Sequence, residues 1–181
     1  MMSFASSSSA HAKLQPHDKM NVQLSGERVQ VVSFHLGNEE YGVDIAQVQE
    51  IIRMVEITHV PRAPHFMEGV INLRGQLIPI IDLRTRFGMS RAEHTKSTRI
   101  VVTEIGSKRV GIVVDSVSEV LNIPIEHVED APDMIAGVGT EYIQGVGKVA
   151  DRLIILLDLT MVMSGEEKQQ LESIEAVVAA T

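Results

Sequence analysis

Four aspartates come closest to a catalytic pattern in this chain. Asp44, Asp82, Asp115 and Asp158 recur at related or nearly related places in its two halves, and paired carboxylates can perform general acid and base chemistry. Asp82 and Asp158, however, each end a short apolar run, where an aspartate commonly caps a turn or a short helix. We therefore predict capping for these two residues, and no catalytic residue.

The other reactive side chains show no pattern of a metal or nucleophile site. The histidines stand at positions 11, 17, 35, 59, 65, 94 and 127. None of them forms an HxH or HxxxH pair that would favour metal binding. Cysteine is absent, which excludes disulfides and thiolate chemistry. There is no glycine-rich phosphate loop and no nucleophile elbow. The sequence predicts neither a metal nor a cofactor.

The composition narrows the class of partner. Sixteen Lys and Arg against 24 Asp and Glu give a net charge of −8, so there is no basic surface for nucleic acid or anionic lipid. The first 28 residues are polar and Ser-rich, without the apolar core of a secretory signal. We predict a disordered lead-in over 1–28. No apolar run is long enough for a membrane helix, and we expect a cytoplasmic protein that does not insert into the membrane.

Strand patterns dominate the rest of the chain. The segments 29–36 (VQVVSFHL) and 99–105 (RIVVTEI) are rich in β-branched residues and end at Gly-containing turns. The runs LIPIIDL and LIILLDL are short and apolar, as is typical of strands buried on both faces. Pro79 inside the first run predicts an edge strand or a bulge.

Two segments carry helix signals. Asp44 precedes IAQVQEII, with Gln47 placed for a capping box, which predicts a short helix. Ser164 precedes GEEKQQLESIEAVVAA, with Glu167 three residues on, which predicts a C-terminal helix within 164–181. That helix has few apolar residues, so we expect it to lie along one edge of the protein or to project into solvent.

An internal repeat organises these elements. A shift of 69 positions places 29–54 on 98–123, with Glu50 on Glu119, and a shift of 76 places 66–83 on a second block, with Gly69 on Gly145. Two copies of a short-stranded unit predict two small β-barrels. Each copy is marginal for burying its own core, so we expect the barrels to pack together with a groove between them.

The copies differ most at one turn. The first copy has INLRGQ at 71–76 where the second has GKVADR at 147–152, so the barrel itself does not require Asn-Leu-Arg-Gly. In the simpler interpretation, Gly75 supplies a positive φ and Arg74 is a solvated turn residue. In the other, the turn serves the groove and Arg74 uses its planar fork of donors there.

Three segments together resemble the CheW family of bacterial chemotaxis coupling proteins. They are VSFHLGNEEYGVDIAQVQEI, PHFMEGVINLRGQLIPIIDLRTRF and KRVGIVVDSVSEVL. The resemblance implies a mainly β fold of two tandem SH3-like five-stranded barrels around a shared hydrophobic core, with short helices and a C-terminal helix. It implies a CheW-like domain over 29–163, with barrels at about 29–90 and 98–160, strand exchange between them being left open, and a helical tail over 164–181.

The resemblance also implies function and sites. Members are non-catalytic adaptors that join the cytoplasmic tip of methyl-accepting chemoreceptors to the regulatory domain of the histidine kinase CheA, at membrane receptor arrays. It places Asn72, Arg74 and Gly75 at a receptor groove, to which we also assign Gly69, Ile100 and Gly111. It places Val43, Ile45, Val48 and Glu50 at the kinase interface. Core packing is the alternative for the three apolar residues of that interface, and a solvated position for Glu50.

Two other function classes remain open at this stage. An enzyme would bind a small molecule in the groove, whereas an adaptor would bind a receptor helix and a kinase domain there and on its flank. A CheW-like adaptor of a related, non-flagellar sensory system would carry the same motifs.

Overall fold

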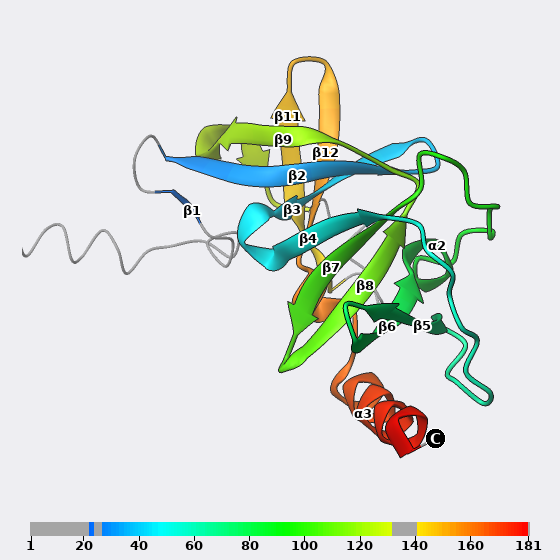
Figure 1. The fold of residues 1–181 in the computed structure, drawn as a ribbon. Helices are drawn as coiled ribbons and strands as arrows, with labels where there is room; N and C mark the ends of the chain where they lie inside the picture. Colours follow the sequence, from blue (N-terminus) through cyan, green and yellow to red (C-terminus); the bar gives the residue numbers. More distant parts are fainter. Residues whose placement is uncertain (1–21, 24–26, 132–140, 181) are drawn as a thin grey trace, which may run out of the picture.

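Most of the chain folds into two β-sheets of short strands joined by tight turns (Figure 1). The computed structural model describes residues 22–23, 27–131 and 141–180. The first sheet has seven strands, in the order β1-β2-β3-β12-β11-β10, with β9 also paired to β2. Its strands are β1 (Val22–Gln23), β2 (Arg28–Leu36), β3 (Glu39–Asp44), β9 (Ser116–Pro124), β10 (Val128–Glu129), β11 (Ile143–Val149) and β12 (Arg152–Leu157).

The second sheet has five strands in the order β4-β7-β8-β6-β5. They are β4 (Val48–Arg53), β5 (Met67–Leu73), β6 (Gln76–Asp82), β7 (Arg99–Ile105) and β8 (Lys108–Val114). Thr58, shortly after β4, exchanges two backbone hydrogen bonds of 2.8 and 2.9 Å with Val70 of β5. This bridge joins the segment that follows edge strand β4 to the other edge strand, β5, and so closes the sheet.

The first sheet closes in an analogous way. Strand β9 pairs with β2 and then leads through a 3₁₀ turn, η3 (Ile125–His127), into β10, which pairs with β11. We call the closed seven-stranded sheet barrel I and the closed five-stranded sheet barrel II. The predicted mainly β fold of two barrels is confirmed, with the short strands β1 and β10 as additions to barrel I.

Each barrel takes strands from both copies of the repeat. In barrel I, β3 of the first copy lies parallel to β12 of the second, with Gly42 opposite Leu156. In barrel II, β6 of the first copy lies parallel to β8 of the second, with Ile81 opposite Ile112. Strands β4 and β9, which are repeat-related, also pair with the other copy, β4 with β7 and β9 with β2. The two copies are therefore interlocked.

Three hydrophobic cores explain why the strands are apolar on both faces. Successive residues of a strand point to opposite sides of the sheet, so Val31 of β2 packs inside barrel I while Val32 packs between the barrels. On β7, Ile100 packs inside barrel II and Val101 between the barrels. The core between the barrels is the largest and draws on both sheets, as the predicted shared core requires.

The predicted helix after Asp44 is wrong. The Asp44 side chain does accept a hydrogen bond from the Ala46 backbone N–H, at 2.8 Å. It caps only one 3₁₀ turn, η2 (Ile45–Gln47), after which β4 begins at Val48. The residues of β4 alternate between half-buried and exposed, and this period of two, with pairing to β7, overrides the helical capping pattern.

The predicted C-terminal helix is confirmed as α3 (Gly165–Ala180), which Figure 1 shows beside barrel II. Its capping box is formed in both directions. The Ser164 N–H donates to Glu167 Oε1 at 2.8 Å, and the Glu167 N–H donates to Ser164 Oγ at 3.1 Å. Leu171 is buried in the core between the barrels, and Arg86 donates two hydrogen bonds to Glu167. No helix in the described part of the chain is long and apolar enough to span a membrane.

The other predictions about single elements have different outcomes. Asp82 and Asp158 cap α2 (Leu83–Arg86) and the 3₁₀ turn η4 (Leu159–Met161), so the capping prediction is confirmed. The edge-strand prediction at Pro79 is wrong, because β6 lies between β5 and β8. Pro79 pairs with Val70 of β5, and the register irregularity of that strand pair lies between Met67 and Gly69. The predicted lead-in lies largely outside the described residues, although Val22–Gln23 forms β1 on β2.

Asp115, the remaining aspartate of the catalytic hypothesis, is held by an arginine. Arg84 donates to both carboxylate oxygens at 2.8 and 2.6 Å, and the Gly37 backbone N–H donates to the same group at 2.8 Å. The hydrogen bonds from Arg84, more than any other contact, hold the pKa of Asp115 below its ordinary value. The carboxylate thus ties α2 to the β8–β9 connection and serves the fold.

This pair predicts a pH-dependent stability. A depressed pKa in the folded state stabilises the protein above the ordinary pKa of aspartate, and the contribution is lost as the pH falls through the folded-state pKa. We expect Arg84→Met to lower the melting temperature by about 3 °C at pH 7. The difference from the wild type should shrink at acidic pH as Asp115 becomes protonated. A difference that stays constant from pH 7 to pH 3 in thermal melts would argue against this role of the pair.

Candidate functional site

The turn between β5 and β6 uses Asn72, Arg74 and Gly75 to bend the chain. Arg74 and Gly75 have φ angles of +53° and +86°, as expected for the two central residues of a type I′ hairpin turn. Asn72 Oδ1 accepts a hydrogen bond of 2.8 Å from the Gly75 backbone N–H. Glycine tolerates this conformation at no steric cost, so Asn72 and Gly75 account for the bend.

The side chain of Arg74 also links the turn to strand β4. It donates two hydrogen bonds to Glu50 of β4, of 3.0 Å to Oε2 and 2.5 Å to Oε1. The hydrogen bonds from Arg74, and then the charges of Arg74 and Arg109, lower the pKa of Glu50. The Arg74 side chain is 65% exposed and that of Glu50 is 30% exposed. An exposed pair of this kind contributes little to stability, so its bidentate geometry is more informative about recognition than about folding.

The corresponding place in barrel I is built differently. Ala150 stands at the position of Arg74 and has the same φ angle of +53°. Glu119, the counterpart of Glu50, lies 3.4 Å from Arg152. Arg152 also forms an ion pair of 3.3 Å with Glu40. Both barrels therefore keep the glutamate, but only barrel II has an arginine at the tip of the hairpin.

The structure brings four of the predicted site residues together at this turn: Asn72, Arg74, Gly75 and Glu50. Sequence analysis had placed the first three at a receptor groove and Glu50 at a kinase interface. Their contact means that the two predicted surfaces adjoin and share one ion pair.

Four other predicted site residues lie in the interior. Val43 and Ile100 are fully buried. A Cβ at Gly111 would lie 2.5 Å from Ile80 Cδ1 and 2.8 Å from Ile100 Cγ2, and one at Gly69 would lie 2.3 Å from the Thr58 carbonyl oxygen. These residues contribute to the packing of the barrels. A substitution at one of them could affect partner binding only indirectly, by changing that packing.

The last two predicted residues, Ile45 and Val48, are half-buried against the core between the barrels. Val117 of β9, the repeat counterpart of Val48, packs in the same way. Three residues further along each strand, Ile51 and Val120 are 38% and 48% exposed. Sequence reasoning did not select this exposed pair. The repeat could have identified it, because an apolar residue is kept at the same outward position in both copies.

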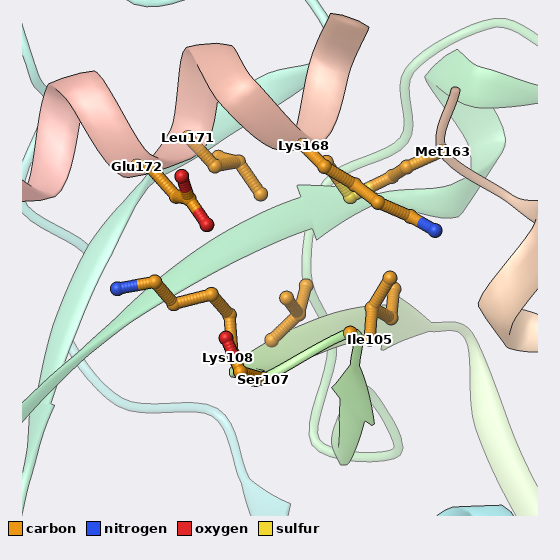
Figure 2. Close-up of a pocket in the computed structure, with 9 residues that line it drawn as sticks. Ile105, Ser107, Lys108, Met163, Lys168, Leu171 and Glu172 are labelled. Atoms are coloured by element: carbon orange, nitrogen blue, oxygen red, sulfur yellow. The ribbon is translucent and has the colours of Figure 1, made fainter. Parts of the chain in front are cut away.

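A small cavity lies under α3, lined by residues of the β7–β8 hairpin and of the C-terminal segment. Its volume is about 60 Å³, and the apolar side chains of Ile105, Met163 and Leu171 line it together with the charged ones of Lys108, Lys168 and Glu172 (Figure 2). Ligand sites usually measure about 300 Å³ or more. In the part of the chain that the structure describes, no three His, Asp or Glu side chains are arranged to hold a metal.

Comparison with known proteins identifies the family and decides between an enzyme and an adaptor. A family description, the CheW-like domain, matches residues 30–167. The chemotaxis protein CheW of Klebsiella aerogenes is 40% identical over 154 residues, covering 84% of this chain and 93% of that protein. CheW of Treponema pallidum is 33% identical over 168 residues, covering 91% and 99%.

A solved structure supports the same conclusion. The crystal structure of the scaffolding protein TtCheW from Thermoanaerobacter tengcongensis superposes with a TM-score of 0.71 at 37% identity, covering 77% of this chain and 95% of that one. Sequence match and fold therefore agree. The chain therefore belongs to the CheW family and is a non-catalytic scaffold of chemotaxis signalling.

Proposed function

We propose that the chain couples methyl-accepting chemoreceptors to a histidine kinase of the CheA type. One observation carries the proposal: the two most specific sequence motifs, VQEI and NLRG, meet in space through the bidentate pair of Glu50 and Arg74. VQEI begins β4, whereas NLRG covers the end of β5 and the turn after it, and the pair is exposed enough to meet a partner. A contact that served only the fold would be expected at both copies of the repeat, and only barrel II has it.

The receptor contact is proposed at the Asn72–Gly75 turn, and the kinase contact along η2 and β4 at Ile45, Val48 and Glu50. The exposed Ile51 gives β4 an apolar residue on the same strand as Glu50, and arginine, as at Arg74, is enriched in protein interfaces. Because Glu50 and Arg74 are joined by two hydrogen bonds, a partner that binds one of them changes the hydrogen-bonding groups that the other offers to a second partner. This geometry suits an adaptor that must sense one partner while holding another.

The proposed location is the cytoplasmic side of the membrane, reached through the receptor. The net charge of −8 offers no attraction to anionic lipid or nucleic acid, so we propose that partners alone bring the chain to the receptor array.

A reconstitution experiment tests the function. Purified full-length chain is mixed with a CheA-type kinase and a soluble cytoplasmic chemoreceptor fragment, and kinase autophosphorylation is measured. We expect stimulation only when all three proteins are present, because an adaptor supplies proximity and no chemistry of its own. Stimulation of the kinase by the chain without receptor would refute the coupling role, as would full stimulation by receptor without the chain.

A further inference from the structure

Arg109 of β8 makes contacts on two other strands of barrel II. Its Nε donates to Gln49 Oε1 of β4 at 2.9 Å, and an Nη donates to Gln76 Oε1 of β6 at 2.8 Å. The other Nη lies 3.6 Å from Glu50 Oε1. The guanidinium therefore spans the outer face of the sheet from β6 to β4, and its two amide acceptors fix the plane of its fork.

The carboxylate of Glu50 is shared by two guanidinium groups. Its Oε1 receives Arg74 at 2.5 Å and also faces Arg109. An isolated surface pair must order two flexible side chains, which offsets most of its Coulomb gain. Here the Glu50 carboxylate is already restrained by its ion pair with Arg109. Arg109 is itself anchored by both glutamines, and its side chain is only 26% exposed. Arg74 then has to order only itself to complete the pair.

The repeat shows which part of this network belongs to the fold. The counterpart of Arg109 is Glu40, and the counterpart of Gln76 is Arg152. In barrel I, Arg152 joins Glu40 and Glu119, so the same three positions are linked with their charges arranged differently. In barrel I no side chain from the hairpin tip joins this network, because Ala150 stands at the position of Arg74. In barrel II the contact between Arg109 and Glu50 supports the side chain of Arg74, which reaches Glu50 from the hairpin tip.

We propose that Arg109 is a positioning residue that holds the Glu50 carboxylate in place for Arg74, and so sets the strength of receptor binding at the Asn72–Gly75 turn. The proposal rests on the function proposed above, and it adds a residue outside the two motifs that identified the site. Arg109 acts through Glu50, so its loss should weaken binding without removing it.

The test uses the full chain with Arg109→Met, which keeps an apolar stem and removes the guanidinium. The first measurement is the titration of the Glu50 carboxyl group by NMR. Since Arg109 helps to lower the pKa of Glu50, we expect that pKa to rise in the variant, and to rise further in Arg74→Ala/Arg109→Met. The second measurement is affinity for a soluble cytoplasmic chemoreceptor fragment, which should fall about fivefold, as for coupled neighbouring side chains. The melting temperature should change little.

Three further variants separate positioning from general structure. Arg109→Lys keeps the charge but cannot hold both glutamines, so it should restore the Glu50 titration in part and affinity in part. Gln76→Ala removes one anchor only and should produce a smaller change in the same direction. Arg152→Met removes the corresponding guanidinium from barrel I and should leave both the Glu50 titration and receptor affinity unchanged.

The outcomes distinguish this inference from the proposed function. An unchanged Glu50 titration in Arg109→Met would overturn the positioning role whatever the partner. A shifted titration with wild-type affinity would overturn it too, provided that Arg74→Ala still loses binding. If Arg74→Ala itself binds like the wild type, the proposed site is wrong, and the role assigned to Arg109 in receptor binding fails with it.

Discussion

Arg74→Ala is expected to abolish receptor-dependent kinase activation while the protein stays folded. The turn should survive, because Ala150 already adopts the same φ angle of +53° at the equivalent turn of barrel I. The side chain is 65% exposed, and removing an exposed ion pair should move the melting temperature by no more than about 3 °C. The activity should fall because the variant leaves Glu50 without its bidentate partner at the point where the two predicted surfaces adjoin.

Matched variants make this prediction specific. Arg74→Lys should recover activity only in part, since an ammonium group cannot reproduce two parallel hydrogen bonds. Glu50→Gln should resemble Arg74→Ala, because it removes the charge that holds the arginine. Ala150→Arg, the corresponding change in barrel I, should have little effect. Wild-type activation by Arg74→Ala in the three-protein assay would return Arg74 to the simpler interpretation of a charged turn residue.

Gly69→Ala is expected to cause the largest loss of stability among single substitutions at the predicted site. The added Cβ would lie 2.3 Å from the Thr58 carbonyl oxygen and 2.7 Å from Ile57 Cγ2. The oxygen belongs to the backbone bridge that closes barrel II, so it cannot move without opening the barrel. We expect a loss of about 3 kcal/mol in the free energy of unfolding, measured by urea denaturation.

Another glycine supplies the control. Gly165, at the start of α3, has no atom within 4 Å of an added Cβ and no positive φ angle, so Gly165→Ala should be neutral or slightly stabilising. Gly145→Ala, the repeat counterpart of Gly69, would meet the Glu129 carbonyl oxygen at 2.5 Å and should also destabilise. A loss below about 1 kcal/mol for Gly69→Ala would mean that the bridge is adaptable and that barrel closure does not depend on it.

Sequence patterns within short segments predicted those elements that depend mainly on interactions between neighbouring residues. The runs at 77–83 and 153–159 were read as strands buried on both faces, and the structure places them between two cores. Ser164 and Glu167 correctly predicted α3, because a capping box needs only neighbouring residues. The same reasoning failed after Asp44, where the cap was real but pairing of β4 with β7 determined what followed.

The site was harder to predict, because it depends on contacts between distant residues. The family resemblance selected both Arg74 and Glu50, yet it assigned them to different surfaces, and their contact across 24 positions appears only in the folded chain. Periodicity could not tell the buried Val43 from the exposed Ile51, because both lie in apolar strand patterns. Arg109 belongs to neither of the two motifs that carried the site, and only its position on β8 beside them makes it visible.

The exchange of strands between the two copies has a mechanical consequence. Most two-domain proteins bend at a linker, since few contacts cross between the domains. Here the parallel pairs β3–β12 and β6–β8 join the two copies within each barrel. Neither copy can therefore rotate as a rigid body without breaking the hydrogen bonds of a sheet. The chain should accordingly unfold in one cooperative step, and it should fold slowly because its pairings are distant in sequence. If the chain couples a receptor and a kinase as proposed, the strand pairs that cross between the copies would hold the two partners in a fixed relative orientation.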